Sequence, residues 1–216
     1  MITDLGKTHP DLEGILLIEG RGLTSNVYVI LGQRVALVDT GSGPPDNPLL
    51  PQLEKRGIDM RKINNVLITH AHPDHAGGLI EFVSLHDMTI RVHPAGVDLV
   101  PPGMRVEPLR DGDSVSAGHL TLKAIYTPGH SSESLCLYNP AYQILFSGDT
   151  AFPGGSFGRT DLPTGDGGRL LESLRRLSQL PVRHLLPGHE KPVVGEGFVH
   201  LRASLRSAEA FVLDEV

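Results

Sequence analysis

Ten residues, "THAHPDHAGG" at 69–78, hold four side chains that could bind a metal: His70, His72, Asp74 and His75. Imidazole nitrogens and carboxylate oxygens are the usual protein ligands of catalytic zinc, and imidazole also suits iron. The stretch follows an apolar segment that favours a strand. Because side chains alternate along a strand, His70 and His72 are expected to point to the same side. The spacing therefore predicts a metal site.

Four other apolar segments end in the same way, in a turn rich in Gly or Pro that carries an Asp or a His. They are "VALVDTGSG" with Asp39, "AIYTPGHSS" with His130, "ILFSGDT" with Asp149 and "HLLPGHE" with His189. Any one of them alone would favour a structural turn, since Asp and Gly are common turn formers. Together they place polar groups at strand ends, where a rigid sheet can hold them in fixed geometry.

Seven of these residues form a candidate ligand set, namely His70, His72, Asp74, His75, His130, Asp149 and His189. A catalytic zinc takes three protein ligands, so seven suit two ions about 3.5–4 Å apart with one bridging carboxylate. Asp149 is the expected bridge, because it is the only carboxylate of the set outside the first cluster. Asp39 is expected to hold a ligand imidazole by a hydrogen bond, with a purely structural turn as the alternative.

The charge of such a centre predicts its substrate. Two divalent cations, two carboxylates and one hydroxide leave a charge of about +1, and a metal-bound water can have its pKa lowered to roughly 7. We therefore expect a nucleophile at neutral pH and a small-molecule substrate that carries a carbonyl and possibly a negative charge. Asp74 could orient the attacking water or take its proton, so Asp74 and Asp149 are the candidate catalytic residues.

The pattern of strands and helices predicts how these residues are positioned. Strands are expected over 14–20, 26–32, 34–40, 63–69, 88–94, 120–126, 134–139, 143–149 and 183–187. Helices are expected over 49–57, 76–86 and 169–180, and at the end of the chain on Leu201, Leu205, Ala208 and Val212. Strands dominate, which favours an α/β (α+β) fold with two mainly antiparallel or mixed sheets and helices outside them. No shift in composition divides the chain, so 1–216 is expected to be one domain.

The glycine-rich stretch 151–168 lacks a strand or helix pattern and leaves directly from Asp149, so we expect it beside the metals. Long loops in compact domains are usually functional or disordered. Within it, Arg159 could bind a substrate carboxylate, or it could pair with Asp161 and pin the loop.

Composition limits the other function classes. The net charge is −6 and the basic residues are dispersed, which argues against nucleic-acid binding. No apolar run approaches a membrane span, and the N-terminus lacks the apolar region of a signal peptide. With Cys136 as the single cysteine, a cytoplasmic location is expected. The closing helix could serve a homodimer. Six histidines are interpreted as surface or packing residues, namely His9, His86, His93, His119, His184 and His200.

The ordered set "VDTG", "THAHPDH", "TPGH", "SGDT" and "LPGHE" resembles the metallo-β-lactamase superfamily over about residues 15–190. The resemblance implies a four-layer αββα sandwich with a dinuclear site at one edge of its two sheets. It also implies that His70, His72 and His130 hold the first ion, that Asp74, His75 and His189 hold the second, and that Asp149 bridges them.

Residues 146–166 resemble the branch that contains glyoxalase II and the persulfide dioxygenases. Two functions follow. One is a hydrolase with two divalent ions, expected to be zinc, in which a metal-bound hydroxide cleaves a thioester, lactone or related acyl bond. The other is a persulfide dioxygenase with one iron on His70, His130 and Asp149, a two-histidine, one-carboxylate set. Ser156 replaces a cysteine common in this loop, and little more than one helix follows His189, so glutathione as substrate is left open.

Overall fold

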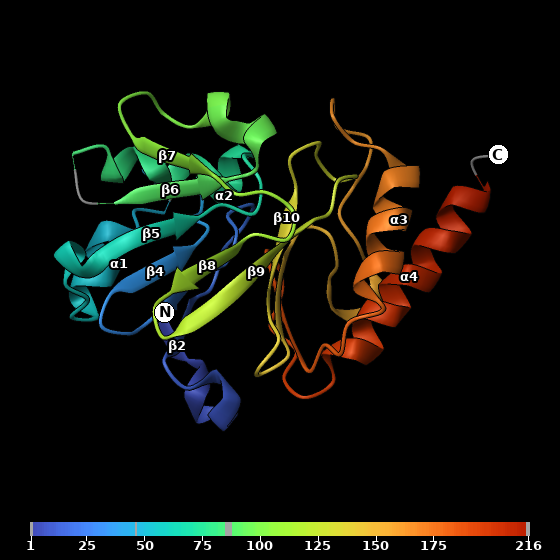
Figure 1. The fold of residues 1–216 in the computed structure, drawn as a ribbon, viewed down its shortest axis with the longest axis horizontal. Helices are drawn as coiled ribbons and strands as arrows, with labels where there is room; N and C mark the ends of the chain where they lie inside the picture. The colour runs from blue at the N-terminus through green and yellow to red at the C-terminus, as the bar shows by residue number, and fades with distance from the viewer. Residues whose placement is uncertain (1, 46, 85–87, 215–216) are drawn as a thin grey trace.

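The computed structural model describes residues 2–45, 47–84 and 88–214 and contains two sheets packed face to face (Figure 1). The strands of the first sheet lie in chain order, β1 (Ile2–Asp4), β2 (Ile15–Ile18), β3 (Val27–Ile30), β4 (Val35–Val38), β5 (Ile63–Leu67), β6 (Thr89–Val92) and β7 (Arg105–Pro108). Strands β1 to β4 pair antiparallel and β4 to β7 pair parallel. The carboxyl ends of β4 and β5 therefore meet at one edge.

The second sheet has the order β12-β11-β10-β9-β8. Its strands are β8 (Ser114–Ala117), β9 (Leu120–Tyr126), β10 (Leu135–Asn139), β11 (Ile144–Gly148) and β12 (His184–Pro187). All pairs are antiparallel except β11 with β12, which is parallel. This parallel pair brings the carboxyl ends of β11 and β12 to the same edge as β4 and β5.

Helices cover the outer face of each sheet (Figure 1). The first sheet is covered by α1 (Leu50–Lys55), α2 (Pro73–Ala76) and the 3₁₀ segment η4 (Gly77–Phe82), and the second by α3 (Gly167–Leu177) and α4 (Gly197–Asp214). Shorter 3₁₀ turns are η1 (Leu5–Lys7), η2 (Pro10–Leu12), η3 (Met60–Lys62), η5 (Pro94–Leu99) and η6 (Pro153–Gly155). None of the described helices is both long and apolar enough to cross a membrane.

The alternation of side chains along the strands produces three separate apolar layers. On β2, Ile15 and Leu17 face the other sheet, whereas Leu16 and Ile18 face the α1 side. On β10, Leu137 lies in the layer between the sheets, whereas Cys136 packs with α3 and α4. Three apolar layers between four layers of secondary structure confirm the predicted αββα sandwich.

Helix α3 shows how the sequence specifies one of these elements. The Asp166 carboxylate accepts a hydrogen bond from the backbone N–H of Arg169 at 2.9 Å and so caps the helix. The buried face consists of Leu170, Leu171, Leu174 and Leu177, as predicted. Replacing a fully buried leucine such as Leu174 by alanine costs about 2–5 kcal/mol. Leu201, Leu205, Ala208 and Val212 of α4 pack into the same layer, and a homodimer through this helix stays a prediction.

The structure differs from the sequence predictions in several segments. The helix expected over 76–86 begins earlier, at Pro73, and continues as the 3₁₀ segment η4 only to Phe82. Gly77 and Gly78 approach the backbone after β4 so closely that a Cβ on either would collide with it, and this approach fixes the segment. His86 lies outside the described residues. The strand expected over 63–69 ends at Leu67, and β1, β7 and β8 were not predicted.

Candidate metal centre

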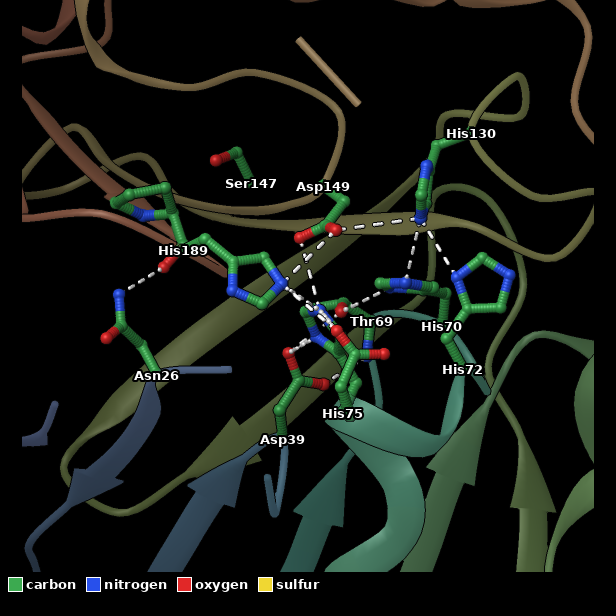
Figure 2. A network of polar contacts seen from close by, with 12 residues as sticks. Asn26, Asp39, Thr69, His70, His72, His75, His130, Ser147, Asp149 and His189 are labelled. Carbon is green, nitrogen blue, oxygen red and sulfur yellow. Dashed lines mark hydrogen bonds and ion pairs between the residues drawn. The ribbon is translucent and has the colours of Figure 1, made fainter. Parts of the chain in front are cut away.

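All seven predicted ligands converge at the edge where the two sheets meet (Figure 2). Four come from the segment after β5, and His130 comes from the turn between β9 and β10. Asp149 and His189 follow β11 and β12. Elements of both sheets therefore build the site together.

The first ligand group consists of His70, His72 and His130. The Nε2 atom of His130 lies 3.2 Å from Nε2 of His70 and 2.9 Å from Nδ1 of His72. On its other side, Nδ1 of His130 donates to the carbonyl oxygen of Arg159 at 2.8 Å. A neutral imidazole has one proton, so Nε2 of His130 presents a bare lone pair to the other two rings.

The second ligand group consists of Asp74, His75 and His189. The Nε2 atom of His189 lies 3.3 Å from Nε2 of His75 and 3.2 Å from Oδ2 of Asp74. Nδ1 of His75 donates to Oδ2 of Asp39 at 2.9 Å, which leaves its Nε2 free to act as a ligand. Asp39 therefore contacts a ligand imidazole, as expected from the sequence.

Two hydrogen bonds from Thr69 hold the Asp39 carboxylate in place. The carboxylate accepts hydrogen bonds from the backbone N–H of Thr69 at 2.8 Å and from the Thr69 hydroxyl at 2.9 Å. Asp39 adopts a positive φ of 59° directly after β4, so its backbone turns sharply as the strand ends. The carboxylate thus links the ends of β4 and β5 and fixes the ring of His75.

Asp149 lies between the two ligand groups. Its Oδ1 is 3.2 Å from Nε2 of His75, and its Oδ2 is 3.5 Å from Nε2 of His189 and 3.6 Å from Nε2 of His130. Oδ1 is buried without a hydrogen-bond partner among the described residues. A buried carboxylate oxygen in that state is costly unless a cation compensates it.

The donor set fits a metal. Imidazole nitrogens that face one another at 2.9–3.3 Å need a proton or a cation between them. In His75 and His130, Nδ1 already carries a proton, which it donates to Asp39 and to the Arg159 carbonyl respectively. Histidine nitrogens and carboxylate oxygens are the ligands that zinc and iron take in proteins. The two ligand groups and Asp149 could therefore hold metal.

The electrostatics of the site favour positive charge at its centre. Burial opposes ionisation of Asp149, but the adjacent His75 ring outweighs it and holds the pKa of Asp149 far below its usual range. Burial would lower the pKa of His75, but Asp149 and Asp39 raise it well above the ordinary value. For His70, burial dominates and lowers the pKa, so this ring stays neutral and available as a ligand.

Glycine is required at two positions where the backbone passes the ligands. A Cβ on Gly188 would collide with Oδ1 of Asp149 and with the ring of His75. A Cβ on Gly158 would collide with the Asp149 carbonyl and the ring of His130. These close approaches explain the glycine before His189, and they place the 151–168 loop against the candidate ligands, as predicted.

The orientation of His70 and His72 has a different cause from the one predicted. Strand β5 ends at Leu67, so strand alternation does not act on these two residues. Their loop is instead held by Glu133, a buried residue whose Oε1 accepts a hydrogen bond from the backbone N–H of Ala71 at 3.3 Å. Sequence reasoning missed Glu133, although it lies only three residues after His130.

Asn26 supports His189 and was also missed. Its side-chain amide donates to the carbonyl oxygens of Pro187 at 3.0 Å and Glu190 at 2.8 Å, on either side of His189. Its backbone N–H donates to Gly188 at 2.7 Å. The sequence gives no local sign of this role, because the partners lie about 160 positions away.

Arg159 pairs with its neighbour. Its Nε and Nη2 atoms donate to the two carboxylate oxygens of Asp161, each at 2.7 Å. The hydrogen bond from Arg159 lowers the pKa of Asp161 to about 2. The structure therefore favours the internal pair, while the Arg159 carbonyl supports His130 from behind.

A cleft of about 910 Å³ opens over the ligands. Its floor carries His72, Asp74, Asp149 and His189, and its walls are largely apolar, formed in part by Leu23, Pro73, Phe152, Leu162 and Pro163. Exposure of the Asp74 and His189 side chains is 30% and 27%. Asp74 and His189 of the second ligand group, with His72 of the first, therefore face the space that a substrate can enter.

The described histidines outside the site make local contacts. His93 stacks on Tyr126 with ring centroids 4.2 Å apart, and His119 contacts the Leu31 carbonyl. His200 accepts from the Gly154 N–H. His9 and His184 lie edge to face around Asp11 and could also hold a metal, but Arg183 already occupies the same Asp11 oxygen at 3.0 Å.

Comparisons with known proteins agree with this geometry. Atrochrysone carboxyl ACP thioesterase of Aspergillus fumigatus is 31% identical, over 80% of this chain and 40% of that protein. Hydroxyacylglutathione hydrolase of Rhodopseudomonas palustris is 34% identical, over 78% of this chain and 64% of that protein. The chain thus spans less than two thirds of the length of these relatives.

Solved structures show the same fold. TTHA1623 in a di-iron-bound form is 28% identical with a TM-score of 0.69, covering 88% of this chain and 96% of that one. ETHE1 from Myxococcus xanthus has a TM-score of 0.69 at 22% identity, covering 90% and 89%. The family model described as the metallo-beta-lactamase superfamily matches residues 20–189. On this match and on the converging ligands, the chain belongs to the metallo-β-lactamase superfamily.

Proposed function

We propose that this metal-dependent hydrolase carries two zinc ions and cleaves a thioester or a related acyl bond. The observation that carries the proposal is the position of Asp149, whose two oxygens lie within 3.2–3.6 Å of imidazoles from both ligand groups. One ion would leave one of these groups without a function. A similar chain described in a di-iron-bound form supports the number of ions, and zinc is proposed because hydrolysis needs no redox change.

The proposed roles of the residues are these. His70, His72 and His130 would hold one ion, Asp74, His75 and His189 the other, and Asp149 would contact both. Ions bound there supply a water of lowered pKa and polarise a carbonyl group.

Asp74 is the residue that we propose to orient the attacking water or to accept its proton. Burial opposes its ionisation, but the hydrogen bond from His189 prevails and lowers the pKa of Asp74. It is therefore a carboxylate at neutral pH, and its half-exposed oxygens face the cleft. In that state it accepts a hydrogen bond from water and orients it. Thioester hydrolysis then consumes one water and yields a carboxylic acid and a thiol.

The cleft supports an acyl substrate. Its walls next to the ligands are apolar, and the one cation beside them, Arg159, is already neutralised by Asp161. Two curated relatives are named as a thioesterase and a hydroxyacylglutathione hydrolase. Both names denote cleavage of a thioester, which makes this bond the first choice among acyl substrates.

The competing function is a persulfide dioxygenase with one iron on His70, His130 and Asp149. It would need neither Asp74 nor His189. The complete second ligand group, together with the brace that Asn26 gives His189, supports the hydrolase instead.

An activity assay on protein that keeps the metals acquired during expression tests the proposal. We expect release of free thiol from acyl thioesters, measured by a thiol-reactive dye, and no oxygen uptake with a persulfide of a small thiol. His189→Ala should abolish thiol release. Oxygen consumption that needs His130 but survives in His189→Ala would contradict the proposal and support the dioxygenase.

A further inference from the structure

A second groove adjoins the cleft over the metal centre. It has a volume of about 660 Å³ and lies between the β2–β3 loop and helix α1. Gly22, Leu23 and Ser42 line both the groove and the cleft. Leu23 is 86% exposed, so it stands as a ridge between the two spaces. A substrate held at the metals can therefore extend past Leu23 into the groove.

The groove differs from the cleft in its charge. Arg21 lines it from the β2–β3 loop and Lys55 from the end of α1, and among the described residues that line it Glu19 is the only carboxylate. Neither cation forms an ion pair within 4.0 Å among the described residues, whereas Arg159 in the cleft is fully engaged by Asp161. On a chain with a net charge of −6, two such cations at one groove favour an anion.

The neutral polar residues of the groove are already committed to one another. The amide of Gln52 donates to Asn47 at 2.8 Å and to the Pro48 carbonyl at 2.9 Å. The hydroxyl of Thr24 accepts from the backbone N–H of Ser42 at 2.8 Å. Arg21 and Lys55 are thus the charged donors left for a ligand, beside the Ser42 hydroxyl. A guanidinium binds a phosphate through two parallel hydrogen bonds, and an ammonium adds a mobile point charge.

We propose that Arg21 and Lys55 bind a phosphate on the thiol part of the substrate, so that the substrate is a thioester of a phosphorylated pantetheine. The proposal rests on the thioester hydrolysis proposed above. The apolar acyl group lies against Phe152 and Leu162 in the cleft, the thioester lies over the ligands, and the thiol part passes Leu23 into the groove. The two spaces thus separate the two products, an apolar acid and an anionic thiol.

A matched pair of substrates tests the proposal on the full-length metal-loaded protein. Acyl-4′-phosphopantetheine and acyl-pantetheine share the acyl group and differ only in the phosphate. We expect kcat/KM to be about tenfold higher for the phosphorylated substrate. Arg21→Ala and Lys55→Ala should each lower that kcat/KM about three- to fivefold through KM. Neither should change kcat/KM for acyl-pantetheine, and the double variant should make the two substrates equal.

Two controls keep the result specific. Arg34→Ala removes the same charge from an exposed residue at the opposite end of β4 from Asp39 and should leave both substrates unchanged. Arg21→Lys should retain much of the preference. Added salt should reduce the preference for the phosphorylated substrate and leave acyl-pantetheine unaffected, because salt screens exposed charges.

The outcomes separate the two proposals. If the wild-type protein hydrolyses both substrates equally, or if Arg21→Ala lowers kcat/KM on both alike, the phosphate site is wrong and the hydrolase stands. If it hydrolyses neither, thioester hydrolysis fails and the phosphate site falls with it. Assays with the same acyl group on coenzyme A and on a carrier protein identify which of the two supplies the phosphorylated pantetheine. A lower kcat/KM of Arg21→Ala with either of these substrates supports the phosphate site, and an unchanged kcat/KM with both overturns it.

Discussion

The two ligand groups differ in how deeply they are held. In the first, His70 and His130 are 1% and 4% exposed, and the Arg159 carbonyl fixes His130 from behind, so only His72 is partly exposed to the cleft. In the second, His75 is buried against Asp39, but Asp74 and His189 reach into the cleft. In the proposed dinuclear site, the first group would therefore hold its ion deeper inside the protein. The second group should exchange metal more readily and act closest to the substrate.

The strongest test of this comparison removes the residue that both groups share. Asp149→Asn keeps the size of the side chain but removes the charge that faces three imidazoles. We expect loss of more than about 100-fold in activity and weaker binding of both ions. Metal analysis after dialysis and circular dichroism measure these effects. A variant that keeps both ions and activity would show that Asp149 does not join the groups.

Removing one member of each group should separate them. We expect His189→Ala to lose the second ion and keep the first, because His70, His72 and His130 remain intact. His130→Ala should instead lose the buried ion. Titration with a chromophoric chelator counts the ions and ranks their affinities. Equal loss of both ions in His189→Ala would mean that the groups are not independent.

A smaller effect is expected when only the support of the second group changes. Asp39→Asn weakens the hydrogen bond that fixes Nδ1 of His75 and the contacts to Thr69. We expect about 10–100-fold weaker binding of the second ion, the range typical of residues that orient a ligand histidine. Isothermal titration with zinc measures it. If only the first ion weakens, the assignment of Asp39 to the second group is wrong.

The smallest effect is expected at the rim of the cleft. The pKa of Asp161 is lowered to about 2 by Arg159, so the pair stabilises the loop above the unfolded pKa of about 3.9. That contribution is lost as the pH falls toward 2. Arg159→Ala should change activity less than about threefold, because its carbonyl still supports His130. NMR titration of Asp161 checks the pKa, and a large rise in KM would instead give Arg159 a role in substrate binding.

The sequence predicted which side chains converge better than it predicted what holds them. The seven candidate ligands and Asp39 could be found because their chemistry and their position at strand ends are local properties. Glu133 and Asn26 could not be found, because each acts on backbone groups that only the fold brings near. The expected helix over 76–86 failed for the same reason, since tertiary contacts of Gly77 and Gly78 determine that segment. Strand β7 carries no fully buried residue and so lacks the apolar pattern of the other strands.

The central claim is that both ligand groups hold an ion. Elemental analysis of protein expressed without added metal, combined with anomalous diffraction at the zinc and iron edges, tests it most directly. We expect two zinc ions per chain, one at His70, His72 and His130 and one at Asp74, His75 and His189, with Asp149 contacting both. A single iron per chain at His70, His130 and Asp149, with no ion at the second group, would contradict it.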